Sequence, residues 1–173
     1  MAARFNHLLP IGALAALVTL VLDQASKWWL LNVLDIAERA PVRVTPFFDL
    51  VLQWNIGISF GLLQNDSPAA QLALMLVKVV AVIALAIWMA RSQTILATIA
   101  LGLIIGGAIG NVIDRLRFGA VVDFLYFHAG SWYWPAFNLA DSAICLGVAA
   151  MLLDGLLLRR DAPQANRGED VSP

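Results

Sequence analysis

The stretch LGLIIGGAIGNVIDRLRFGAVVDF, residues 101–124, joins an apolar run directly to a cluster of charged side chains. Gly102, Gly106 and Gly110 recur at four-residue steps, which places them on one face of a helix and lets a second helix approach closely in lipid. One more step along that face is Asp114. The stretch therefore predicts a membrane helix that directs a carboxylate into a helix bundle.

The rest of the chain has the composition of a membrane protein. It has 173 residues, of which 61% are hydrophobic, and its mean hydropathy is +0.80. An apolar run of roughly 20 residues can cross a bilayer as a helix. Four such runs are found, at residues 8–31, 69–90, 94–113 and 136–158. We expect an all-α membrane protein with four transmembrane helices in a single domain, residues 1–173, and a polar tail over residues 159–173.

The position of the termini follows from this count. Four spans place both ends of the chain on the same side, and the lysines and arginines number five on that side against four on the other. This small excess favours cytoplasmic termini. Residues 8–22 resemble a secretory signal, but DQASKWWLL follows without a small-residue cleavage site, so we expect an uncleaved first span.

The loop over residues 32–68 is expected to hold a small β-sheet. Residues 48–60 alternate between apolar and polar side chains, and the segment 120–127 is rich in β-branched and aromatic residues. Both segments lie on the side opposite the termini. Tryptophans near the predicted span ends on that side are typical of a membrane interface: Trp28, Trp29, Trp54, Trp132 and Trp134.

Several functional classes find little support. A net charge of -1 offers no basic surface for nucleic acid, and a single cysteine, Cys145, excludes an internal disulfide. One cysteine and two histidines are a poor ligand set, so no metal or other cofactor is expected. The segment GISFG, residues 57–61, matches the G-x-S-x-G motif of serine hydrolases, but Ser59 falls in the alternating strand rather than at a strand-to-helix turn.

Acidic residues at the edges of the apolar runs each require a partner or a function, because a charge inside the bilayer is costly. Asp23 precedes Lys27 by one helical turn, and Asp154 lies a turn before Arg159, so both can form ion pairs. For Asp23 and Lys27, a structural pair and a supporting role at a site remain equally open. Lys78 lies in the second run without an acid in register, and no function is assigned to it.

The remaining polar residues gather near the end of the third run and the start of the fourth. Asn111, Asp114 and Arg115 share a helix face, while Asn138 can cap the fourth helix three residues before Asp141. Asp123 follows in the strand-like segment. Two readings stay open: a polar interior of the bundle, or a pair of carboxylates, Asp123 and Asp141, that share a proton and activate water.

Four blocks of the sequence, in this order, resemble the lipoprotein signal peptidases, the type II signal peptidases of bacteria: DQASK, NIGISFG, GNVIDRLRFGAVVDF and FNLADSAI. The resemblance covers nearly the whole chain. It implies an aspartyl peptidase of the bacterial inner membrane, with cytoplasmic termini and its active site at the periplasmic face. Its substrates would be diacylglyceryl-modified prolipoproteins, cut before the lipidated cysteine. Membrane lipids would be its surroundings. Separately from the resemblance, we expect a monomer.

The resemblance also implies roles for individual residues. Asp123 and Asp141 match the catalytic pair of the family, and the pair is expected to give a bell-shaped dependence of rate on pH. Positions that line or support the site are Asn55, Gly57, Asn111, Asp114, Arg115, Asn138 and Ala140, with Asp23 and Lys27 in a further block. Ser26 stands where the family often has threonine, and Ile58 and Ser59 replace two alanines, which affects only fine contacts of the substrate groove.

Two other classes of function are compatible with buried acids. A small transporter or proton-relay subunit would place its carboxylates near the middle of the bilayer. A membrane assembly factor without activity would use the glycine-rich segment only for packing and would tolerate Asp123→Asn.

Overall fold

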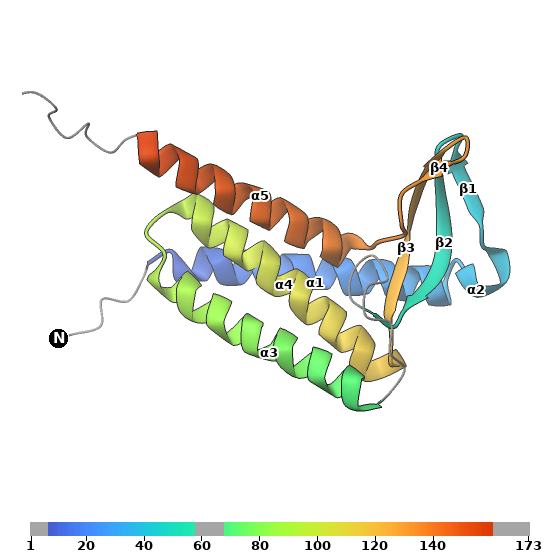
Figure 1. Ribbon diagram of the computed structural model, residues 1–173, viewed down its shortest axis with the longest axis horizontal. Helices are drawn as coiled ribbons and strands as arrows, with labels where there is room; N and C mark the ends of the chain where they lie inside the picture. Colours follow the sequence, from blue (N-terminus) through green and yellow to red (C-terminus); the bar gives the residue numbers. More distant parts are fainter. Residues whose placement is uncertain (1–6, 58–67, 161–173) are drawn as a thin grey trace, which may run out of the picture.

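The computed structural model describes residues 7–57 and 68–160, and Figure 1 shows a bundle of long helices with a small sheet at one end. The predicted strand residues 58–60, Ser59 among them, lie outside the described residues. Along the chain the elements are α1 (Leu9–Asn32), α2 (Ile36–Arg39), β1 (Val42–Thr45), β2 (Phe48–Asn55), α3 (Pro68–Arg91), α4 (Ile95–Phe118), β3 (Val121–Ala129), β4 (Trp132–Tyr133) and α5 (Leu139–Arg160).

Three helices in the described part of the chain are long and apolar enough to cross a membrane: α1, α4 and α5 over Leu139–Leu158. The helix α3 is equally long but is not among these three, so the predicted count of four spans is not confirmed and remains a prediction. The five tryptophans expected at the membrane interface are all exposed. The protein is thus a mainly helical membrane protein with a small antiparallel sheet.

The glycine face of α4 is where α1 and α5 come closest to it. A Cβ atom added at Gly102 or Gly106 would collide with the backbone of Gly12 or Ala16 in α1. On the other side, a Cβ atom at Gly107 would lie only 2.5 Å from the carbonyl oxygen of Ala140 in α5. The close approach of a second helix that the sequence predicted is therefore confirmed. The first turn of α5 also packs closely against α4, near the polar C-terminal part of α4.

The sheet has the strand order β1-β2-β3-β4, with antiparallel neighbours. A register shift between Leu50 and Gln53 interrupts the alternation that the sequence suggested for β2. After the shift, Gln53 pairs with Asp123 and Asn55 with Val121. The shift thus places Asn55 beside the segment of β3 that carries Asp123.

A buried apolar cluster fixes the sheet on the end of the bundle. It contains Leu30 from α1, Ile36 from α2, and Val122 and Phe124 from β3. Side chains alternate across a strand, so residues 122 and 124 face this cluster while Asp123 faces the opposite side. The packing of its two neighbours therefore directs Asp123 away from the apolar cluster.

Candidate active site at the sheet end of the bundle

Asp123 is almost completely buried, with 1% of its surface exposed. Its two carboxylate oxygens accept hydrogen bonds from the side-chain amides of Asn55, at 3.0 Å, and Asn138, at 2.6 Å. Burial raises the pKa of Asp123 to about 6, against the lowering effect of the hydrogen bond from Asn55. The nearby charge of Asp141 raises this pKa further, while Asn138 and Lys27 lower it. Asp123 can therefore exchange a proton close to neutral pH, as a general acid or base requires.

Asn138 and Asn111 connect the two carboxylates. Asn138 accepts a hydrogen bond from the backbone N–H of Asp141 at 2.9 Å, so it caps α5 as the sequence predicted. The amide of Asn111 donates to Asp141 at 2.9 Å, and its oxygen accepts from Asn138 at 3.3 Å. Asp123 and Asp141 are thus oriented by two asparagines that also bond to each other.

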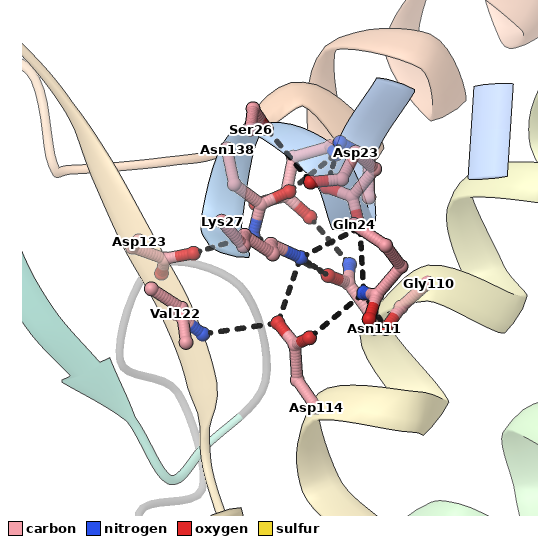
Figure 2. A network of polar contacts seen from close by, with 12 residues as sticks. Asp23, Gln24, Ser26, Lys27, Gly110, Asn111, Asp114, Val122, Asp123 and Asn138 are labelled. Carbon is pink, nitrogen blue, oxygen red and sulfur yellow. Dashed lines mark hydrogen bonds and ion pairs between the residues drawn. The ribbon is translucent and has the colours of Figure 1, made fainter. Parts of the chain in front are cut away.

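Behind the two asparagines lies a buried ion network, shown in Figure 2. The Lys27 ammonium lies 2.9 Å from the carboxylate of Asp23 and 2.7 Å from that of Asp114. It also donates to the side-chain oxygen of Asn111 at 3.4 Å. Asp23 and Asp114 are at most 1% exposed, so the two negative charges share one cation in a dry environment. The structure therefore brings Asp23 and Lys27 into the same assembly as Asp114.

The two acids of this network also bind backbone groups of the candidate site (Figure 2). Asp23 accepts the N–H of Ala140 at 3.0 Å, and Asp114 accepts the N–H of Val122 at 3.2 Å. Ala140 directly precedes Asp141, and Val122 directly precedes Asp123. Through these bonds, Lys27 ties the segment that carries one carboxylate to the segment that carries the other.

Gln24 belongs to the same network, although sequence reasoning did not single it out. Its amide nitrogen lies within hydrogen-bond distance of Asp23 (3.1 Å), the carbonyl of Gly110 (3.2 Å) and Asp114 (2.9 Å). The sequence does contain a sign of this role, because Gln24 is a polar residue next to Asp23 inside an apolar run. A Cβ atom at Gly110 would collide with the carboxylate of Asp23, so glycine is required here for the close contact of α1 and α4.

Arg115 points toward the chain that follows β2. Its guanidinium donates to the carbonyl of Ile56 at 3.4 Å and to that of Gly57. The N–H of Gly57 in turn donates to the side-chain oxygen of Asn55 at 3.1 Å. Because the amide of Asn55 contacts Asp123, Arg115 supports the candidate site through this loop.

A cavity of about 220 Å³ opens beside these groups. Both Asp123 and Asp141 line it, as does Asn55, and the other lining residues are Trp134, Ala136, Phe137, Ser142, Ile144 and Cys145. No three potential metal ligands among the described histidine, cysteine, aspartate and glutamate residues form a group suited to a metal ion. The site is therefore a pair of carboxylates in a largely apolar cavity. Such a pair can activate water for the hydrolysis of a polar bond in a lipophilic substrate.

The family model of signal peptidase II matches residues 15–157 of the chain. The lipoprotein signal peptidase of Nitrobacter hamburgensis is 63% identical over 150 residues, which cover 84% of this chain and 92% of that relative. The enzyme of the same name from Rhodopseudomonas palustris is 58% identical over 151 residues, or 85% of this chain and 92% of the relative. These relatives give the transporter or proton-relay alternative no support.

Two solved structures share the fold. One, a bacterial membrane enzyme determined at 2.3 Å resolution, has a TM-score of 0.79 at 23% identity, covering 95% of this chain and 98% of that chain. Another bacterial membrane enzyme, determined at 1.9 Å resolution, has a TM-score of 0.73 at 25% identity, covering 88% and 97%. The arrangement of helices and sheet is therefore that of a known membrane enzyme.

Proposed function

The chain belongs to the signal peptidase II family of aspartic peptidases, which remove the signal peptide from prolipoproteins, and we propose that Asp123 and Asp141 are its catalytic pair. The observation that carries this proposal is the shared cavity of the two carboxylates. Asn138 donates to the Asp123 carboxylate and accepts from the backbone N–H of Asp141, while Asn111 donates to the Asp141 carboxylate and accepts from Asn138. No other pair of acids among the described residues lines this cavity.

In this mechanism the two carboxylates share one proton. The ionised group takes a proton from water, whose oxygen attacks the carbonyl carbon of the scissile peptide bond, while the protonated group donates to the carbonyl oxygen. Collapse of the tetrahedral intermediate breaks the C–N bond, and the amine leaves with a proton returned by the pair. The raised pKa of Asp123 supports this exchange, because it lies closer to neutral pH than that of an ordinary carboxyl.

The surrounding residues would act by position. Three residues orient the pair by direct hydrogen bonds: Asn55, Asn111 and Asn138. Two more act through the loop after β2: Gly57 and Arg115. Asp23, Lys27, Asp114 and Ala140 form the buried anchor behind it. We place the whole chain in one membrane domain with four spans, cytoplasmic termini and the carboxylate pair at the periplasmic face.

The apolar lining of the cavity supports a lipid-modified substrate. Trp134, Phe137, Ile144 and Cys145 surround the carboxylates with apolar surface that a lipidated residue can occupy, while its acyl chains remain among the membrane lipids. We therefore propose cleavage immediately before a cysteine that carries diacylglycerol, by a monomeric enzyme.

Cleavage of a diacylglyceryl-modified prolipoprotein by the purified protein tests this function. Wild type and Ser59→Ala should both release the signal peptide, and the lipidated cysteine should be the N-terminal residue of the mature lipoprotein. Asp123→Asn and Asp141→Asn should each reduce the rate at least about 10³-fold while the protein remains folded. Equal activity of wild type and Asp123→Asn would rule out the proposed pair.

A further inference from the structure

A second cavity, of about 480 Å³, lies beside the turn between α3 and α4. This turn is at the end of the bundle away from the sheet (Figure 1). The end of α3, the α3–α4 turn and the C-terminal half of α5 form it. Its lining combines apolar surface from Trp88, Met151 and Leu152 with one carboxylate, that of Asp154. A few polar groups in the lining of a largely apolar cavity are a common feature of binding sites.

Asp154 is buried, with 9% of its surface exposed. One carboxylate oxygen accepts the hydroxyl of Thr94 at 2.7 Å, and Thr94 in turn caps the N-terminus of α4. No lysine or arginine side chain in the described part of the chain lies within ion-pair distance of Asp154. The partner expected from the sequence, Arg159, has a side chain outside the described set. A carboxylate that accepts one hydroxyl has capacity for further hydrogen bonds, and a cation beside it offsets the cost of its burial.

One exposed face of α5 lies between the two cavities. Ile144 and Cys145 line the first cavity, Leu152 and Gly155 line the second, and Val148 lies on the same helix face between them. Cys145, Val148, Leu152 and Gly155 are all exposed. An apolar strip thus runs from Asp141 toward the cavity of Asp154.

The length of this strip matches one part of a signal peptide. Asp141 and Asp154 are about 13 residues apart on α5, a rise of roughly 20 Å. A signal peptide has a positively charged n-region, then an apolar h-region of about 7–15 residues, then the cleavage site. As a helix, that h-region would be roughly 10–22 Å long. A substrate with its scissile bond at Asp141 therefore brings its cationic n-region to the level of Asp154.

We propose that Asp154 binds a lysine or arginine of the substrate's n-region while the h-region lies along the exposed strip of α5. This inference rests on the proposed function, because it takes Asp141 as the point of cleavage. Arg91 lines the same cavity and is exposed, so its charge opposes that of an incoming cation. Arg91 therefore provides a control with the opposite expected sign.

The test compares two prolipoprotein substrates, one with two lysines in the n-region and one with glutamines in their place. For wild type, the neutral n-region should raise KM about fivefold, which corresponds to one partly buried ion pair. Asp154→Asn, which can still accept the Thr94 hydroxyl, should raise KM about fivefold for the lysine substrate only. Arg91→Gln should lower KM for the lysine substrate, and kcat should change less than twofold throughout.

A zero-length cross-link gives a second readout. With Asp123→Asn to prevent cleavage, a carbodiimide should activate the Asp154 carboxylate as an O-acylisourea. The amine of the n-region lysine then forms an amide with Asp154, and the reagent leaves as a urea. Adding Asp154→Asn should abolish the cross-link. An equal change in KM for both substrates, or no change, would overturn the proposal. Neither result would affect the catalytic pair, which stands or falls with the loss of activity in Asp123→Asn.

Discussion

Asp114 in α4 accepts a hydrogen bond from the backbone N–H of Val122 in β3, directly before Asp123. The matching bond joins Asp23 in α1 to the N–H of Ala140, directly before Asp141. Because Lys27 lies between Asp23 and Asp114, one buried cation fixes the relative position of the two proposed catalytic segments. The spacing of the pair is therefore set by the interior of the bundle.

Replacement of Lys27 by methionine should destabilise the protein severely. It leaves two buried carboxylates without a cation, and removal of one partner from a buried ion pair costs about 3–5 kcal/mol. Thermal denaturation in detergent would show a large drop in Tm. The combined variant Lys27→Met/Asp114→Asn removes one of the orphaned charges and should recover part of the loss. A Tm for Lys27→Met equal to that of wild type would contradict the central role of this cation.

A methyl group at Gly110 should disrupt the same network sterically. The Cβ atom of Gly110→Ala would collide with the Asp23 carboxylate, so we expect a loss of about 1–3 kcal/mol in stability and a fall in kcat. Gly155→Ala is the matched control, because an added Cβ atom there meets nothing within 4 Å. Its stability should stay within about 1 kcal/mol of wild type. Equal effects of the two substitutions would argue against the packing described for α1 and α4.

Changes at Asn138 should move the pH dependence of cleavage. Asn138→Ala removes a hydrogen bond that favours the ionised form of Asp123, so the pKa of Asp123 should rise. Asn138→Asp also adds a negative charge but retains a capping oxygen for α5, so it should raise this pKa further. In profiles of kcat/KM against pH, the limb set by the pKa of Asp123 should move to higher pH, and it should move further in Asn138→Asp than in Asn138→Ala. A limb that stays in place in both variants would exclude direct control by Asn138.

Stability should depend on pH through Asp123. Its pKa is raised from 3.8 to about 6 on folding, so the native state binds the proton more tightly than the unfolded state. This contribution to stability is fully present below pH 3.8 and is lost as the pH rises through about 6. A rise in pKa of this size corresponds to roughly 3 kcal/mol. The difference in Tm between wild type and Asp123→Asn should therefore change across this window, and a constant difference from pH 4 to pH 7 would contradict the raised pKa.

Much of the fold is visible in local patterns. Apolar runs of membrane-spanning length predicted the long helices, and the four-residue spacing of Gly102 and Gly106 predicted a close helix contact. The strand segments near residues 48 and 121 were also recognisable. The register shift after Leu50 was not, because a bulge depends on the pairing partner rather than on the strand's own sequence. Gln24 was missed for a similar reason, since its three contacts lie mostly on another helix.

The sequence by itself determined that this is a membrane protein and which polar residues must avoid lipid, because hydropathy and helical spacing are local properties of the chain. Resemblance to a family then pointed to Asp123 and Asp141. Only the tertiary structure decided that Lys27 is shared by two acids, that each acid holds the residue before a proposed catalytic aspartate, and that Asp154 lines a cavity. These relations join residues up to 117 positions apart, and their energies depend on distance and burial that no local pattern encodes.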